Sequence, residues 1–445
     1  MKATRIGLVA FLALTAASCG IANPSVTSPG ASPTPLPVLT SAEPTTSAST
    51  GSCAPTTPVP AQGPAAQMQV LAEGGQGGPR VSGVVYPRPT YQGRLWSQWG
   101  QGVVLDDGRF ISAIGDHQGV DGNSFLFVYE PDGRLTRISD VLSLVDHQKG
   151  SFGYGKIHAQ LVKVACDLVV FGTYWGTRTD LRYSGSYTGD HLFSLNTSTW
   201  SIESLGVPIP EHGIPSLAGH GGLVYGEAAD PRGRPAGQSG DVGEFFVFDP
   251  NSRKVVYRSD DQRHIGFRSM GVDSEGRAFL AMPKGGLLRY VPGGELTVLG
   301  GSVGPGWLRA TTEAAPDGTV YAVTTEPDRY VAIRTDGTVD DLGAAAGYSA
   351  SIALSPAGDE IYVVPGAKGN AWERGAPLLA VNVTTGKERV VAELEPLVKE
   401  RLGLVLGGSY NVAVDRRSGR IFVGFNAGAT SDNPWGEVVL LTVEP

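Results

Sequence analysis

Short apolar runs separated by turn residues dominate the chain beyond residue 66, and the pattern repeats. A turn followed by a β-rich run occurs seven times, for example as DDGRFISAIG (106–115), CDLVVFGTYWG (166–176) and SGRIFVGFNAG (418–428). A second apolar run follows each copy after a loop, and most of these runs end in Asp, Asn or Gly, which is typical of β-hairpins. A further run precedes each turn, and a shorter run follows most of the second runs.

Four short strands per unit, repeated every roughly 40–60 residues, are typical of propeller blades. The pattern therefore predicts an all-β fold, a seven-bladed β-propeller with four-stranded blades over residues 67–445. The chain ends at Pro445 on the third strand of the last blade. We expect an N-terminal strand, from 68–74 or 80–87, to close this blade, because pairing removes two exposed sheet edges. One short helix, LEPLVKERLGL, is expected before the last blade.

The N-terminal region has the pattern of an export signal. Lys2 and Arg5 precede an apolar run that is too short for a transmembrane helix and ends in Ala-Ala-Ser-Cys, which resembles a bacterial lipobox. We expect residues 1–19 to be a lipoprotein signal peptide and Cys19 to carry lipid; ordinary signal cleavage is the alternative. Residues 20–66 are rich in Pro, Ser and Thr, so we expect a disordered tether. The predicted protein is exported, extracytoplasmic and attached to the membrane only through its lipid.

Composition narrows the possible partners. The 445 residues carry a net charge of −8, which argues against nucleic acid or an anionic membrane surface as a partner. We expect a monomer. Besides Cys19 the chain has Cys53 and Cys166, which in an exported protein either form a disulfide or remain as two thiols.

Propeller geometry predicts which residues meet at the axis, because the first strand of a blade begins on the face where the second strand ends. The run 153–176 holds both strands of the second blade. Lys156 and His158 therefore enter on that face, and Tyr174 and Trp175 leave on it. We expect these polar ends to line an axial mouth. The same face is expected to collect the candidate ligand-binding residues Tyr187, Trp307, Arg309, Tyr348, Trp372 and Tyr410.

All seven histidines lie between His117 and His264, within the first four blades. This clustering favours chemistry or metal binding, with His117, His158, His191 and His264 as candidate ligands of a divalent metal ion. No Cys/His spacing typical of zinc sites accompanies them. The alternatives are structural: His158 as a core histidine that donates to a carbonyl, and His117 as part of a turn in GDHQG.

Arginines occupy similar places on the first strands of two adjacent blades, at Arg268 and Arg309. Buried arginines near an axis need an anion or a carboxylate partner. We therefore expect either an anionic ligand or pairing with a local acid such as Glu313.

Several stretches of the first four blades resemble seven-bladed polysaccharide lyases, of which ulvan lyases and rhamnose–glucuronate lyases are named examples. The stretches are KIHAQL with FGTYWG, HLFSLN, and RHIGFRSMGVDSEGRAFLA. These lyases use His, Tyr and Arg around the axial mouth to remove the proton next to a uronate carboxylate. The resemblance implies a carbon–oxygen lyase acting on an acidic polysaccharide or other cell-surface glycan. The residues of matching type are the candidate catalytic residues His117, His158, Tyr174 and Arg268.

β-Elimination on a uronate needs a cation, a base and an acid. Arg268, Arg309 or Lys156 suit the first role, His158 or His117 the second, and Tyr174 or Tyr187 the third. A metal ion in place of the arginines would do the same task. The tryptophans expected to stack on sugars are Trp175, Trp307 and Trp372. Two other functions stay open, because propellers host many: a non-catalytic module that binds glycan or protein, and a scaffold for envelope proteins.

Overall fold

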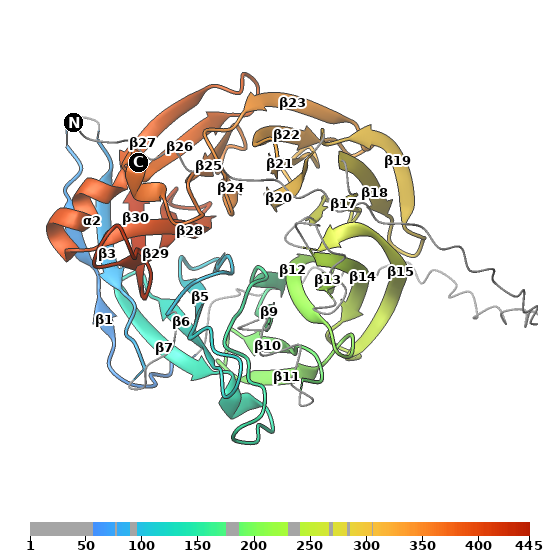
Figure 1. Cartoon of the computed structure of the whole chain (residues 1–445), viewed down its shortest axis with the longest axis horizontal. Helices are drawn as coiled ribbons and strands as arrows, with labels where there is room; N and C mark the ends of the chain where they lie inside the picture. Colours follow the sequence, from blue (N-terminus) through green and yellow to red (C-terminus); the bar gives the residue numbers. More distant parts are fainter. Residues whose placement is uncertain are drawn as a thin grey trace, which may run out of the picture. The chain divides into compact units, whose positions relative to one another are not determined.

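The computed structural model describes residues 57–75, 78–89, 96–174, 187–229, 241–266, 270–282, 285–304 and 306–445, with the side chains of 241–242 and 260–266 left out. Across these residues the strands form seven antiparallel sheets, which Figure 1 shows arranged in a ring. The sevenfold repeat is therefore a seven-bladed β-propeller, as the sequence predicted. No described helix is long and apolar enough to cross a membrane.

The blades follow one another along the chain, each running from an inner to an outer strand. The first three blades are β4 (Val103–Val104), β5 (Phe110–Gly115), β6 (Ser124–Tyr129) and β7 (Arg134–Asp140); β8 (Val162–Ala165), β9 (Leu168–Gly172), β10 (Leu192–Asn196) and β11 (Ile202–Gly206); and β12 (Gly213–His220), β13 (Leu223–Ala229), β14 (Asp241–Asp249) and β15 (Lys254–Gly266). The next three are β16 (Met270–Val272), β17 (Ala278–Ala281), β18 (Gly286–Tyr290) and β19 (Thr297–Ser302); β20 (Trp307–Thr311), β21 (Val320–Thr325), β22 (Arg329–Ile333) and β23 (Val339–Ala344); and β24 (Ile352–Leu354), β25 (Glu360–Val363), β26 (Pro377–Asn382) and β27 (Glu388–Glu393).

The seventh blade is closed by the N-terminal part of the chain. Its inner strands are β28 (Val405–Val414), β29 (Ile421–Gly428) and β30 (Glu437–Glu444), and β3 (Arg80–Val85) pairs with β30 as the fourth strand. The second of the two predicted segments thus supplies the closing strand. The first supplies β2 (Gln69–Ala72), which adds a fifth strand beyond β3. The expected helix is α2 (Leu394–Leu402), which ends where Gly403 takes a φ of +69°.

Burial explains why the middle strands are apolar throughout. Every residue of β5 and β6 is buried, whereas the outer strand β19 alternates between exposed and half-buried positions. Blades pack face to face, so both faces of a middle strand lie against neighbours and both must be apolar. Among the described residues, a hydrophobic cluster fills the space between each pair of adjacent blades, including blades seven and one.

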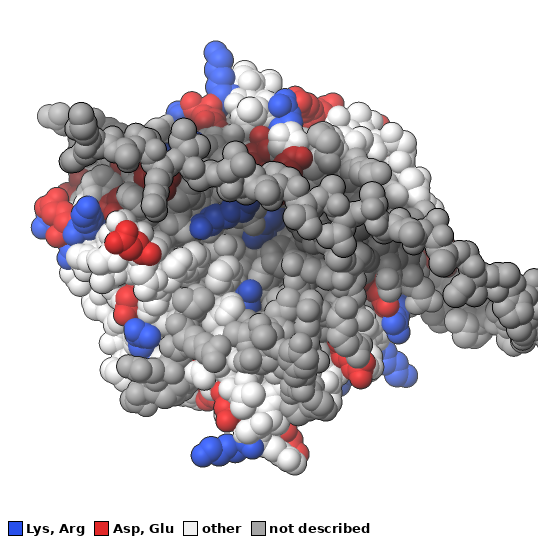
Figure 2. All heavy atoms as spheres, viewed as in Figure 1, with Lys and Arg blue, Asp and Glu red and all other residues white. Residues whose placement is uncertain are grey.

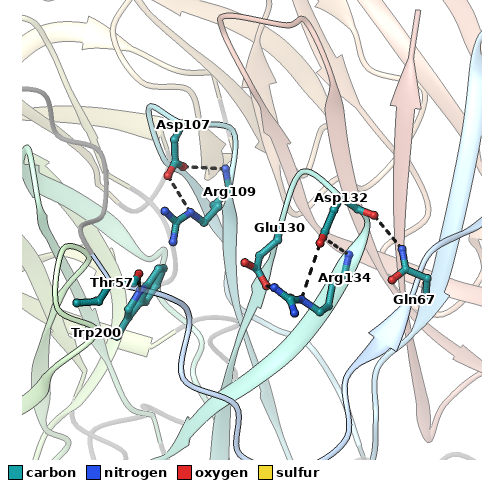
Figure 3. A network of polar contacts seen from close by, with 8 residues as sticks. All are labelled: Thr57, Gln67, Asp107, Arg109, Glu130, Asp132, Arg134 and Trp200. Carbon is teal, nitrogen blue, oxygen red and sulfur yellow. Dashed lines mark hydrogen bonds and ion pairs between the residues drawn. The ribbon is translucent and has the colours of Figure 1, made fainter.

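Contacts with the propeller begin ahead of residue 67, within the segment that composition assigned to the tether. The Thr57 hydroxyl donates to the carbonyl of Ser198 at 2.8 Å, and the Trp200 indole donates to the carbonyl of Thr57 at 3.1 Å. Further along, β1 (Ala66–Gln67) pairs with β7, and the Gln67 amide donates to the carbonyl of Asp132 at 2.9 Å (Figure 3). Residues 57–67 therefore belong to the folded unit. Composition does not predict these contacts, because the hydrogen-bond partners of the segment are turns and strand edges of blades that lie far away in the sequence.

Two short 3₁₀ helices lie between strands in the part of the chain that the structure describes. The first, η1 (Leu142–Leu144), follows β7, and the second, η3 (Ala371–Arg374), lies in the loop between β25 and β26. Cys166, in the turn between β8 and β9, is disulfide-bonded. The chain's other cysteines, Cys19 and Cys53, lie outside the described residues.

Candidate functional site

An aromatic and cationic cluster lies at the axial face where the first, second and seventh blades meet. Trp99, just before β4, is at its centre. The Trp99 ring lies 4.6 Å from the ring of Tyr410 in β28 and stacks on Trp435, before β30, at 5.7 Å. His117, after β5, lies 5.4 Å from the Trp99 ring. We call Trp99, His117, Lys156, Tyr174, Tyr410 and Trp435 the Trp99 cluster.

Lys156 is held between two of these rings. An isolated β-bridge joins Lys156 to Tyr174, whose N–H donates to the Lys156 carbonyl at 2.8 Å. The Lys156 ammonium lies 4.3 Å from the Trp99 ring centroid and 5.3 Å from that of Tyr174. Ring faces attract a cation, more strongly where water is scarce, and Lys156 is only 8% exposed. Lys156, at one of the two polar ends predicted for the run 153–176, thus lies against Trp99 at the centre of the cluster.

His117 sits in a fixed loop and is neutral. Its φ is 57°, in the left-handed region, and its N–H donates to the carbonyl of Gly155 at 2.8 Å. The buried Asp116 carboxylate holds the loop by accepting the N–H groups of Gln118 and Asn123, each at 3.0 Å. Burial, and then the charge of Lys156, lower the His117 pKa to about 3. At neutral pH the imidazole therefore carries no charge and can accept a proton.

His158 is fully buried behind Tyr174. Its Nδ1 lies 2.9 Å from the carbonyl oxygen of Pro215, and its ring centroid lies 5.1 Å from that of Tyr174. A carbonyl only accepts, so Nδ1 carries the hydrogen and donates it. This is the contact expected of the structural alternative, in which the histidine joins neighbouring blades.

Arg309 extends the cluster toward the sixth blade. It lies on β20, is 2% exposed and donates through Nε to the Tyr348 hydroxyl. Its guanidinium lies 5.3 Å from the Tyr348 ring and 5.9 Å from the Tyr410 ring. Glu313, the acid considered as a partner for Arg309, pairs with Arg416 instead at 3.1 Å.

Three predicted ligand-binding residues lie elsewhere or play packing roles. The Tyr187 hydroxyl donates to Asp190 at 2.6 Å, and burial raises the pKa of Tyr187 well above its ordinary value. Trp307 packs between the fourth and fifth blades with the hydrophobic cluster of Leu308. Trp372 lies in η3.

The histidines do not converge on a metal site in the part of the chain that the structure describes. Nδ1 of His191 lies 3.1 Å from the Ser204 hydroxyl, with its ring stacked near Phe193. No group of three or more His, Cys, Asp or Glu suited to a metal ion occurs among the described residues. Trp175, Arg268 and the side chain of His264 lie outside them.

Two hollows adjoin the axis. A cavity of about 380 Å³, lined by residues that include Tyr348, Lys368 and Arg374, lies in the sixth blade next to the Trp99 cluster. A larger cavity, of about 600 Å³, is lined by the far ends of the first strands, so it lies at the opposite end of the axis. Two ion pairs lie in its lining, Lys163 with Asp106 at 2.5 Å and Arg416 with Glu313 at 3.1 Å.

Sequence reasoning missed Trp99, Trp435 and Lys368. Trp99 precedes the first strand of blade one, and the other two lie in loops that follow second strands. The geometric rule that selected Lys156 and Tyr174 covers all of these positions. Applied to every blade, it would have found them.

No family model matches the chain, and no curated protein matches it. Among solved structures, a catalytically inactive virginiamycin B lyase variant from Staphylococcus aureus, with quinupristin, aligns at a TM-score of 0.51. The identity is 10%, over 81% of this chain and 99% of that chain. The WD40 β-propeller domain of Doa1 aligns at a TM-score of 0.48 and 14% identity, over 79% and 95% of the two chains. At such identity the first likeness shows the fold alone, a β-propeller.

Proposed function

We propose that this protein is a carbohydrate-active propeller whose axial mouth binds an acidic glycan and cleaves it by β-elimination beside a uronate carboxylate. One observation carries the proposal: Lys156 and neutral His117 both contact the Trp99 ring, and Tyr174 contacts the same Lys156 ammonium. These are a cation, a base and an acid around an aromatic platform, which is the set of roles that the reaction needs.

Binding follows from the Trp99 cluster. Exposed edges and faces of aromatic rings pack against the apolar face of a sugar, while a cation in a site of low dielectric attracts a carboxylate strongly. Lys156 would neutralise the uronate carboxylate and stabilise the negative charge that the carboxylate gains as the α-proton leaves.

The elimination itself can be written for these residues. A bound uronate carboxylate offsets the charge of Lys156 and so raises the His117 pKa. The His117 imidazole then takes the proton on the carbon next to the carboxylate, and that electron pair forms a carbon–carbon double bond. The bond from the neighbouring carbon to the glycosidic oxygen breaks, and the Tyr174 hydroxyl gives its proton to that oxygen. The products are a sugar with a new free hydroxyl and an unsaturated uronate. Proton exchange with water then restores both side chains.

A non-catalytic glycan-binding module is the second candidate. Two of the predicted acid and base residues are poorly placed for proton transfer: the Tyr187 hydroxyl donates to Asp190, and His158 is fully buried behind Tyr174. A mouth with rings and a cation but fewer available proton donors would bind an acidic glycan without cleaving it.

Export and lipid attachment at Cys19 form part of the proposal. The disulfide at Cys166 supports it, because disulfides persist in oxidising compartments outside the cytosol. Replacing Cys19 with Ala should move the protein from the membrane fraction to the medium. Continued membrane fractionation of Cys19→Ala would contradict lipid anchoring.

The decisive experiment measures binding and cleavage on a panel of uronate-containing glycans. Unsaturated uronate ends absorb ultraviolet light, so cleavage is read directly, and calorimetry reads binding. We expect Lys156→Met to lose both and His117→Asn to lose cleavage while it retains binding. Lys163→Met and His212→Asn, whose wild-type side chains bond Asp106 and the Pro210 carbonyl, serve as controls.

The possible results of this experiment lead to different conclusions. Binding without ultraviolet product in the wild type would replace the lyase by the binding module. A wild type that binds no uronate glycan would overturn the proposed function.

A further inference from the structure

Two segments of the sixth blade enclose a preformed pocket beside the Trp99 cluster. One segment precedes β24 and includes Gly347 and Tyr348; the other follows β25 and includes Lys368, Asn370 and Arg374. We call this cavity the blade-six pocket. The N–H of Gly366 donates to the Tyr348 carbonyl at 2.9 Å, which ties the segments together. Gly366 has a φ of +90°, and a Cβ there would lie 2.7 Å from the Cα of Ala371. This close approach requires glycine.

The pocket carries more positive than negative charge. The Lys368 ammonium lies 4.5 Å from the Tyr348 ring, and Arg374 donates to the carbonyl of Ala346. Neither cation takes part in an ion pair with any other residue that the structure describes. Glu373, the acid in the lining, is exposed and accepts from Asn370 at 3.4 Å.

Another arginine of the same blade, unlike Lys368 and Arg374, has an ion-pair partner. Arg389 pairs with both carboxylate oxygens of Glu360, through contacts of 2.8 and 2.6 Å. Blade six thus satisfies a surface arginine on its outer strand with an acid. In the lining of the pocket it places an exposed lysine and an exposed arginine that have no acid partner among the described residues.

The pocket is continuous with the Trp99 cluster. Tyr348 forms one wall, accepts from Arg309 and lies against that guanidinium, which in turn approaches Tyr410. Tyr410 contacts Trp99 at 4.6 Å. A continuous series of contacts between cations and aromatic rings therefore runs from Lys368 to Lys156. Figure 2 shows Lys and Arg atoms gathered in the hollow near the centre of this face, close to the inner strands β20 and β24.

A second contact joins the two sites on the other side. Gly369, in the pocket loop, lies against Trp435, and a Cβ at this position would be 3.1 Å from the indole ring. The loop of blade six and the Trp99 cluster are thus in contact at Gly369 and Trp435.

We infer that the blade-six pocket is a second anion subsite, which holds an oxyanion on the sugar next to the one bound at the Trp99 cluster. The inference rests on the proposed function and narrows its ligand to glycans with acidic groups on at least two sugar residues. Lys368 and the guanidinium nitrogens of Arg374 that do not bond Ala346 supply the donors. Guanidinium and ammonium groups that share one oxyanion are a common anion-binding arrangement.

The test compares two uronate trisaccharides, one with an acidic group on a single sugar and one with acidic groups on two. The second group is supplied as a carboxylate in one version and as a phosphate ester in another, which distinguishes the source of the oxyanion. Lys368→Gln is the test variant, because the Lys368 side chain bonds no backbone group of the described residues and contacts the Tyr348 ring. Lys387→Gln, an exposed lysine of the same blade, is the matched control.

We expect the wild type to bind the doubly acidic ligand about tenfold more tightly than the singly acidic one, as one well-placed charge contact allows. Lys368→Gln should abolish this preference and leave the singly acidic ligand unaffected, while Lys387→Gln changes neither. Equal affinities in wild type and Lys368→Gln for the doubly acidic ligand would overturn the inference alone. A wild type that binds neither ligand would overturn the proposed function as well.

Discussion

The Lys156 ammonium lies 4.3 Å from the Trp99 ring centroid, and His117 lies on the same ring at 5.4 Å. One indole thus brings together a cation from the second blade and a histidine from the first. The positive charge of Lys156 is the second cause, after burial, that lowers the His117 pKa to about 3. The two side chains are therefore coupled electrostatically as well as sterically.

This coupling predicts the effect of removing the charge. Lys156→Met keeps an unbranched apolar chain against Trp99 but loses the ammonium. The His117 pKa should rise in this variant and still stay below its ordinary value near 6.5, because burial is the larger cause. Histidine ring signals in an NMR pH titration measure this directly. An unchanged His117 pKa would contradict the contact between the two groups.

The low His117 pKa also predicts a pH-dependent stability. Between about pH 6.5 and pH 3 the unfolded chain binds a proton at this histidine and the folded chain does not, so the free energy of unfolding falls as pH falls through that window. Asn tolerates the left-handed backbone at position 117, so His117→Asn removes the titration with little strain. From pH 7 to pH 4.5 the wild type should lose roughly 2 kcal/mol more stability than the variant.

Urea unfolding of the wild type and of His117→Asn at the two pH values measures this difference. Parallel losses in the two proteins would contradict the low pKa of His117.

Closure of the ring predicts a sensitive position at the junction of the last and first blades. Phe422 in β29 is fully buried and stacks on Phe110 in β5 at 4.7 Å. Phe422→Ala should cost about 3–5 kcal/mol of unfolding free energy, the range for truncating a buried aromatic ring. Thermal or urea unfolding reads the loss. Val390→Ala, at an exposed position on β27, should cost far less, and equal losses would contradict a packed junction.

The contacts of Thr57 predict which cysteine forms the disulfide with Cys166. Thr57 is bonded to Ser198 and Trp200 in the same blade as Cys166, and Cys53 lies four residues before Thr57. We therefore expect Cys53 to be the partner. Peptide mapping without reductant should give a linked pair that contains both residues. Cys53→Ser should leave Cys166 titratable by a thiol reagent after denaturation, and an unmodified Cys166 in that variant would contradict the pairing.

The sequence by itself determined the number and order of the blades and the closure of the ring by an N-terminal strand, but not the fifth strands β1 and β2 of the first and last blades. Alternating or continuous apolar runs follow from the burial of each strand, and turn residues follow from hairpin geometry. Both are local patterns, so they can be recognised in the sequence. The missing fourth strand after Pro445 likewise pointed to the N-terminal segment that forms β3. Lys156 and Tyr174 were found because strand ends on one face follow from the same geometry.

Only the tertiary structure decided what surrounds these residues. It stacked Trp435 on Trp99, from the two ends of the propeller sequence, and set Lys156 of the second blade against Trp99. It also joined His158 to the carbonyl of Pro215 and paired Glu313 with Arg416 rather than Arg309. These contacts join residues of different blades, and no local pattern encodes which side chains meet across the axis. Their spacing depends on how adjacent blades pack, which is a property of the closed ring.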